Sequence, residues 1–302
     1  MRNRWVGLGA LAASLAFLAL ALSKTYHKIP KGSLHFSPAF AVCAVLLVAL
    51  ANSWSAFVWR VLLAPRGIDL PFRESLRIIS LSQLGKYLPG GFWQPVGWVG
   101  LGRSSGIAAG VGSVSIGMTM ILIVAAALVV GPVLLVLSHA AGSFVWLLLV
   151  LPLALGLIHP RTLEVVLAFA ARITRRPGLD VGGVPFNHVI VAFLLAVPVW
   201  LIHGTALLLT AHALHMTGGG WALMTGAFAV AWSVGFLALP FPGGLGIRET
   251  VLVILLGGAL TTAQGLLLVV VFRLVFIVAE ALMTGLALVI PRGHVRDVAN
   301  TG

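Results

Sequence analysis

Five charged side chains in this sequence lie beside long apolar runs, where they could do chemistry: Lys86, Arg248, Glu249, Arg273 and Glu280. Arg273 and Glu280 are seven positions apart in one apolar segment, so a helix would bring both to one face, about 10 Å from each other. Three basic side chains could hold an anionic phosphate. The two carboxylates would compete for these cations, so that the anion could be released again. The alternative is structural, because the same residues could form buried ion pairs with one another.

Two Pro-Gly-Gly breaks accompany these charges and are separated by about half of the chain. One is in GKYLPGGFWQPVG, residues 85–97, and the other is in LPFPGGLGIRE, residues 239–249. Irregular backbone at membrane depth is tolerated only where protein buries it or where it lines a wet cavity. Paired interruptions in two halves of a membrane protein point to a transporter binding site, and simple surface turns are the alternative. The residues of the breaks are Pro89, Gly90, Gly91, Pro242, Gly243, Gly244 and Gly246.

The second break should also begin a helix. The start of a helix offers free backbone N–H groups and the positive end of its dipole to an anion such as a lipid phosphate. Arg248 would add a guanidinium at this position, whereas Glu249 could pair with Arg248 or meet a cationic headgroup.

Other kinds of chemistry find little support. His203, His212 and His215 have no carboxylate or cysteine nearby in the sequence, so we expect no metal site. No Ser/His/Asp arrangement and no strand-to-helix glycine motif stands out, so we expect no catalytic residues, no cofactor and no enzyme activity. Cys43 is the only cysteine, which excludes an intrachain disulfide.

The elements that carry these residues must be membrane helices. The 302 residues are 60% hydrophobic and only 9% charged, whereas a soluble domain has about a quarter charged residues. The net charge of +12 comes from basic residues between apolar runs, where anionic lipid and the positive-inside rule explain it, and not nucleic acid.

The pattern predicts an all-α, polytopic membrane bundle of about seven or eight transmembrane helices, with the two breaks in broken or re-entrant segments. We expect one integral membrane domain over residues 1–302, in two halves of about 1–150 and 151–302 that could form an inverted repeat. The amphipathic stretch 64–86 should lie at the membrane interface. The apolar segments that could cross are 5–22, 39–63, 110–137, 143–158, 189–210, 221–239, 264–290 and the short run 250–260.

The basic residues also predict an orientation. Arginine is frequent in 60–103 and 159–176, whereas 138–142 and 211–219 contain no lysine or arginine. The arginine-rich loops and the N-terminus should therefore be cytoplasmic.

Two motifs resemble those of a known family. The segment LSQLGKYLPGGFWQPVG, followed about half a chain later by LPFPGGLGIRETVL, is similar to the lysylphosphatidylglycerol synthase transmembrane-region family. This is the flippase-like membrane half of MprF-type proteins, which also occurs as a stand-alone protein. The resemblance covers nearly the whole chain. It implies a multi-pass protein of the bacterial plasma (inner) membrane that moves lipids between leaflets. The soluble aminoacyl-transferase domain of the larger proteins is absent here, so the lipid cargo is open.

The resemblance adds further residues to the candidate site. It carries Gln83, Gly85, Lys86, Tyr87, Pro89 and Gly90 from the first motif, and Pro242, Gly243, Gly244, Gly246, Arg248 and Glu249 from the second. Arg273 matches the arginine expected in the following helix. The expected substrate-binding residues are therefore Gln83, Lys86, Tyr87, Arg248, Glu249, Arg273 and Glu280.

The leading hypothesis is a lipid flippase or lipid-handling transporter for an anionic or aminoacylated phospholipid. One alternative is a non-transporting membrane subunit for a separate lipid synthase or glycosyltransferase. Another is an intramembrane enzyme acting on lipid-linked phosphates, which is disfavoured because only seven acidic residues exist and most fall in loops or tails. The expected partners are membrane lipids, with no nucleic acid, and an oligomer stays open.

Overall fold

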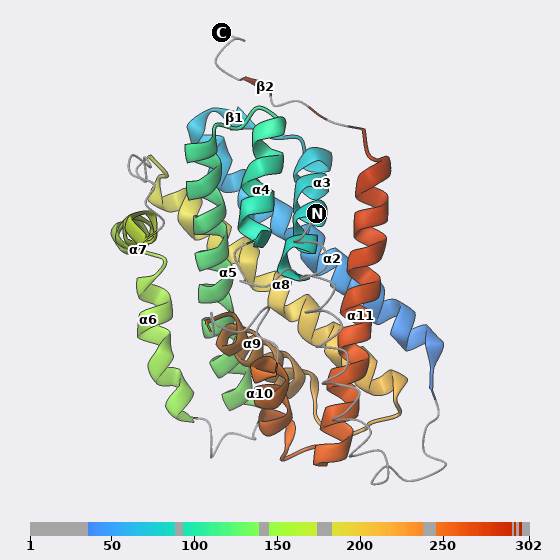
Figure 1. The fold of residues 1–302 in the computed structure, drawn as a ribbon. Coiled ribbons are helices and arrows are strands. Elements are labelled where there is room, and N and C mark those ends of the chain that lie inside the picture. Colours follow the sequence, from blue (N-terminus) through green and yellow to red (C-terminus); the bar gives the residue numbers. More distant parts are fainter. Residues whose placement is uncertain are drawn as a thin grey trace.

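The structure, a computed structural model, is an all-α bundle, as the sequence predicts (Figure 1). It describes residues 36–87, 93–138, 145–173, 183–237, 246–291, 293 and 296–297. Two short strands, β1 (Ile68–Asp69) and β2 (Arg296–Asp297), pair antiparallel. The helices, in chain order, are α2 (Pro38–Leu63), η1 (Ala64–Arg66), α3 (Phe72–Ser82), η2 (Gln83–Tyr87), α4 (Trp93–Ser104), α5 (Ala109–Leu137), η4 (Val145–Val150), α6 (Leu151–Gly156), α7 (Pro160–Ile173), α8 (Phe186–Ala213), α9 (Trp221–Leu237), α10 (Ile247–Leu256) and α11 (Thr262–Val289).

Four helices in the described residues are long and apolar enough to cross a membrane, and they confirm the expected spans near 39–63, 110–137, 189–210 and 264–290. A bent pair, Val145–Gly156 with Arg161–Phe169, turns by 89° and would make a fifth span. The expected span over 221–239 is the shorter apolar helix Trp221–Leu237. The expected span at 5–22 lies outside the described residues, and the total of seven or eight crossings stays a prediction.

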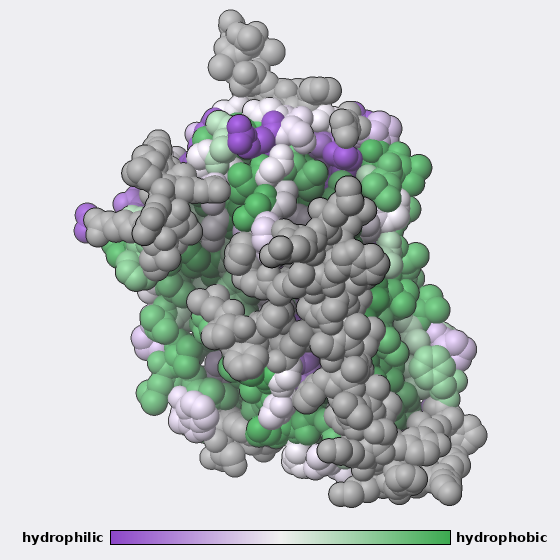
Figure 2. Space-filling model, viewed as in Figure 1, coloured by the Kyte–Doolittle hydropathy of each residue, from purple (hydrophilic) through white to green (hydrophobic). Residues whose placement is uncertain are grey.

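Apolar side chains cover the flanks of the molecule. Figure 2 shows green, hydrophobic residues along the sides, with purple, hydrophilic residues gathered at the upper end. Large exposed apolar residues occur on all four long helices, among them Leu46, Leu137, Leu194 and Leu286. This is the surface that a hydrocarbon environment favours, because no water has to be ordered around it.

Small residues bring the long helices close together. Gly204 of α8 lies against Thr225 of α9 so tightly that an added Cβ would be 2.1 Å from the threonine Oγ1. Gly131 of α5 likewise contacts Val230 of α9, where an added Cβ would be 2.7 Å from the valine Cγ2. Membrane helices associate through such close backbone packing because the hydrophobic effect does not drive them together in lipid.

Two short helices, α3 and α4, form a first helix pair inside the bundle. They run antiparallel from the end where β1 lies; α3 lies beside α2 and α11, and α4 lies beside α5 (Figure 1). Gly85 approaches the backbone of Gln94 so closely that a Cβ would be 2.6 Å away. The expected position of the amphipathic stretch at the membrane interface stays a prediction. Its helix buries Glu74, Ile78 and Ile79 against protein, since its polar groups find partners there.

The second helix pair, α9 and α10, enters from the opposite end of the bundle (Figure 1). Gly218, just before α9, lies against the backbone of Ala259, just after α10. At the other end of the pair, a Cβ on Gly235 would be 2.8 Å from the Cβ of Arg248. The two helices are thus antiparallel neighbours, and Arg248 lies at the inner end of the pair.

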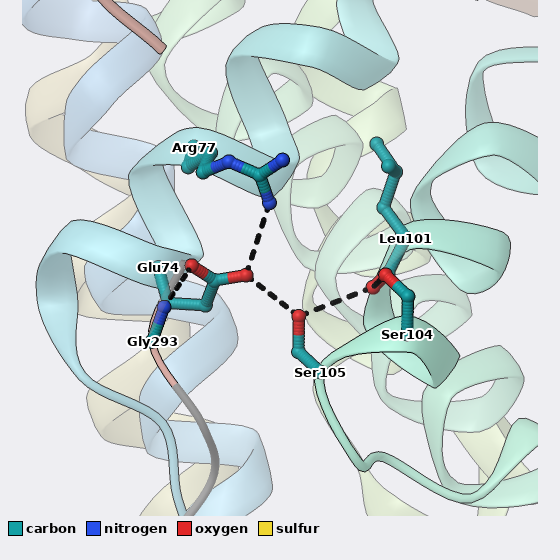
Figure 3. A network of polar contacts seen from close by, with 6 residues as sticks. All are labelled: Glu74, Arg77, Leu101, Ser104, Ser105 and Gly293. Atoms are coloured by element: carbon teal, nitrogen blue, oxygen red, sulfur yellow. Dashed lines mark hydrogen bonds and ion pairs between the residues drawn. The ribbon is translucent and has the colours of Figure 1, made fainter. Parts of the chain in front are cut away.

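A buried carboxylate fastens the C-terminal segment to the first helix pair (Figure 3). Glu74 Oε1 accepts from Ser105 Oγ at 2.6 Å and from Arg77 NH1 at 3.3 Å. Its Oε2 accepts from the backbone N–H of Gly293 at 2.9 Å. Together with the β1–β2 pairing, this network connects the residues after α11 to the start of α3 and to the end of α4.

Candidate functional site

Two ion pairs connect α11 to the two helix pairs. Lys86, in the 3₁₀ turn η2 after α3, donates to Glu280 Oε1 on α11. Arg273 NH1, two helical turns earlier on α11, donates to Glu249 Oε1 of α10 at 2.9 Å. Glu280 and Glu249 are both buried. One face of α11 therefore contacts the inner ends of both pairs through charged groups, as the seven-residue spacing predicted.

Glu249 also closes the start of α10. Gly246, the residue before the helix, has φ of 83°, a left-handed conformation that favours glycine. Its backbone N–H donates to Glu249 Oε2 at 2.8 Å. The carboxylate thus binds Arg273 with one oxygen and caps the helix with the other. The expected alternative of a Glu249–Arg248 pair is wrong, because adjacent helical residues point in different directions.

Arg248 lies against an aromatic wall. Its guanidinium carbon is 4.8 Å from the ring centroid of Phe228 on α9 and 5.1 Å from that of Phe276 on α11. Lys86 Nζ is 5.7 Å from the same Phe276 ring. The rings stabilise positive charge through their negative faces, so two of the three cations share one aromatic contact.

His203 of α8 completes this wall. Its imidazole stacks nearly parallel on Phe276, with centroids 5.2 Å apart and 7° between the planes. It also lies 5.6 Å from the Phe228 ring and 6.1 Å from the Trp200 ring. The imidazole Nδ1 is 2.8 Å from the Val199 carbonyl oxygen. The histidine, which the sequence offered only as a weak metal candidate, is a buried part of the site.

The charged cluster, meaning Lys86, Arg248, Glu249, Arg273 and Glu280, lies far from both ends of α11. Arg273 follows Thr262 by about 17 Å along the helix axis and precedes Val289 by about 24 Å. Glu280 is about 13 Å from that second end. Charged groups at this depth of a membrane helix are expensive and mark substrate pathways or buried pairs. The five residues come from η2, α10 and α11, and the aromatic wall beside them comes from α8, α9 and α11.

The other expected site residues have different positions. Gln83 accepts from Gln94 Nε2 at 2.9 Å, a contact within the first helix pair. Tyr87 ends η2, and its side chain lies outside the described residues. Both breaks lie outside them as well: Pro89, Gly90, Gly91, Pro242, Gly243 and Gly244. Their predicted role therefore stays a prediction.

Sequence reasoning missed the aromatic half of the site. Phe228, Phe276 and His203 come from three helices and meet only in the fold. Phe272 and Phe276 lie beside Arg273 in the sequence and are four residues apart. This spacing could have predicted an aromatic face next to the arginine, since a helix places such residues on one face. Their ring centroids are 5.2 Å apart.

The arrangement can bind an anion by exchange of partners. Three cations face two carboxylates, so one positive charge of the cluster is in excess. An arriving phosphate oxygen could take the place of a carboxylate oxygen on Lys86 or Arg273, while Arg248 approaches from the aromatic wall. Charge-assisted hydrogen bonds of this type are the strong ones in low dielectric.

Comparison with known families gives one match. The family model described as Lysylphosphatidylglycerol synthase TM region matches residues 6–282, which include every member of the charged cluster. No curated protein matches this chain.

Proposed function

Because the chain belongs to the lysylphosphatidylglycerol synthase TM region family, a family of membrane proteins related to lipid handling, we propose that it is a lipid flippase. It moves an anionic or aminoacylated phospholipid between leaflets and catalyses no reaction. The observation that carries this proposal is the charged cluster at the middle depth of α11, where three cations and two carboxylates converge from both helix pairs.

The physical need for such a cluster is the headgroup itself. A phosphate cannot enter hydrocarbon without fixed counter-charges, because the loss of its hydration is prohibitive. Lys86, Arg248 and Arg273 replace that hydration, and Glu249 and Glu280 compete for the same cations. The phosphate is therefore bound by partner exchange and released by the reverse exchange, while the acyl tails stay in the bilayer.

The two helix pairs would serve as gates from opposite sides. Helices α3 and α10 have 11 and 10 residues, about 16 Å and 15 Å long, roughly half of a hydrocarbon core. We infer that each pair enters the membrane and returns to the side it came from. The element order supports an inverted repeat: long α2 and α5 flank α3 and α4, as long α8 and α11 flank α9 and α10.

The same proposal includes a subcellular location and an orientation in the membrane. The family and the basic loops favour a bacterial plasma membrane, with the N-terminus and the end that carries β1 in the cytoplasm. The first helix pair then opens toward the cytoplasm and the second toward the outside. Seven or eight crossings would complete the bundle.

A leaflet-exchange assay tests the function. Purified protein is reconstituted into liposomes with a labelled anionic or aminoacylated phospholipid, and appearance of label in the opposite leaflet is timed. Arg248→Gln and Glu280→Gln should each slow exchange about tenfold, because each removes one charge-assisted contact. Arg103→Gln on exposed α4 makes the same charge change as Arg248→Gln outside the cluster and should leave the rate unchanged.

The assay also separates this proposal from its alternative. Folded wild-type protein that exchanges no tested lipid faster than empty liposomes contradicts a flippase acting alone. The membrane-subunit hypothesis would then predict exchange or synthesis only after a partner enzyme is added.

A further inference from the structure

His203 carries a buried hydrogen-bonding atom for which the described part of the chain provides no partner. The residue is only 5% exposed. Its Nδ1 contacts the Val199 carbonyl oxygen, 2.8 Å away. Since a carbonyl can only accept, Nδ1 must donate, and Nε2 of the neutral ring keeps an accepting lone pair. Within the described residues no group donates to that buried Nε2.

A buried acceptor without a donor is costly, so its position matters. It lies in the aromatic wall of the charged cluster: the imidazole and the Arg248 guanidinium contact the same two rings, Phe228 and Phe276. A ligand that brings a phosphate to Arg248 would therefore bring its headgroup to the neighbourhood of Nε2.

The charges of the cluster restrict what that headgroup can be. The three cations and two carboxylates of the charged cluster carry one net positive charge. A phosphodiester with one negative charge balances this excess. An ammonium on the same headgroup would cancel the ligand's charge and leave the site with its excess in a low-dielectric interior. A neutral hydroxyl gives Nε2 a donor without that penalty.

We propose that His203 is a specificity-determining residue, which accepts a hydrogen bond at Nε2 from a headgroup hydroxyl, and that the cargo is a polyol phospholipid with one negative charge. This inference rests on the proposed lipid site and narrows its substrate class. The cations bind the phosphate, and the histidine accepts a hydrogen bond from the hydroxyl. Lipids that share the phosphodiester and lack the hydroxyl should bind less well, because they leave the buried acceptor unpaired.

The test compares two lipids of equal charge, one with headgroup hydroxyls and one without. Phosphatidylglycerol and phosphatidylethanol carry the same single negative charge, but only the first has headgroup hydroxyls. Short-chain forms of both are titrated into the purified full-length protein in detergent, and the dissociation constants are compared. Wild type should bind phosphatidylglycerol roughly fivefold to tenfold more tightly.

Variants at His203 assign the preference to this residue. His203→Phe keeps the stacked ring and removes the acceptor, so it should bind the two lipids equally. Measurable binding of phosphatidylethanol by this variant shows that the site is folded, and the ratio of its two dissociation constants is the readout. His203→Gln supplies an amide oxygen and should restore part of the preference.

The outcomes distinguish the two levels of inference. Equal binding of both lipids by wild type, or a preference that His203→Phe retains, overturns the role of His203 while the lipid site stands. Tighter binding of phosphatidylethanolamine than of phosphatidylglycerol overturns the polyol class. Failure of every lipid to bind the folded protein overturns the proposed function together with this inference.

Discussion

At the scale of single residues, the Lys86–Glu280 pair shows most directly why the site is ionic. The Glu280 side chain is only 2% exposed, and its lysine partner comes from a turn 194 residues earlier in the chain. The carboxylate could not be buried here alone, because the desolvation of an isolated ion exceeds what a membrane bundle can offset. The pair therefore links the position of η2 to that of α11.

A double-mutant cycle tests this link. Lys86→Met leaves the buried carboxylate without its cation and should lower the free energy of unfolding by about 3 kcal/mol. The double variant Lys86→Met/Glu280→Leu should recover most of that loss, since no lone charge remains. Denaturant titration in detergent measures both. Asp69→Asn, which breaks the half-exposed Arg60–Asp69 pair, serves as control and should cost below about 1 kcal/mol. Equal losses in the single and double variants would contradict the coupling.

The sequence predicts the members of the charged cluster but not their pairing. Charged residues in apolar helices are visible because almost nothing else there is charged. Their partners depend on helix rotation: Glu249 and Arg248 are adjacent in the chain, yet Glu249 turns to Arg273 and Arg248 turns to the phenylalanines. Phenylalanine is common in any membrane helix, so the aromatic wall carries no signal of its own before the helices are packed.

At the scale of elements, length separates what the sequence predicts from what it does not. The long apolar segments near 39–63, 110–137, 189–210 and 264–290 become four long helices, because 28 residues of apolar helix have few other stable states. The segment near 221–239 is as apolar as those, but its described helix, Trp221–Leu237, is shorter. Hydropathy alone does not predict how many residues of an apolar segment form one helix.

The contact between α8 and α9 should be intolerant of any added side-chain atom. In Gly204→Ala the new Cβ would meet the Thr225 Cα at 2.4 Å, which is backbone and cannot turn away. The helices must separate, so we expect loss of folded protein after membrane extraction, measured as the monodisperse fraction in size-exclusion chromatography. Gly285→Ala on α11, where no atom lies within 4 Å, should behave as wild type. A fully folded Gly204→Ala protein would contradict this packing.

The Glu74 network should hold the C-terminal segment against the first helix pair. Glu74→Ala removes the acceptor of the Gly293 N–H and of the Ser105 hydroxyl. We expect amide hydrogen exchange to rise about tenfold at Gly293 and in β2, because a hydrogen bond to a charged group is worth about 1.5–3 kcal/mol. Glu164→Ala on the exposed face of α7 is the matched control. Unchanged exchange at Gly293 would show that the strand pairing alone holds this segment.

At the scale of the whole molecule, the two helix pairs give the bundle two ends with different chemistry. The end with β1 carries Arg60, Arg66 and Arg103, whereas the described residues of the other end, around Ser37, His215 and Thr261, include no lysine or arginine. The cluster between them touches both pairs through α11. A lipid headgroup that reaches this cluster from one side would thus contact both pairs at once, which is the requirement for passing from one to the other.

This polarity predicts opposite accessibility of the two ends in intact cells. In a Cys43→Ser background, a cysteine introduced at Asp69 or Arg103 should react with a membrane-impermeant maleimide only after the membrane is opened. A cysteine at His215 or Thr261 should react in intact cells, since the proposed orientation places the basic end in the cytoplasm. Labelling of all four positions from one side would contradict a bundle that spans the bilayer along α11. Labelling with the two ends exchanged would keep the bundle but reverse the direction in which each helix pair opens.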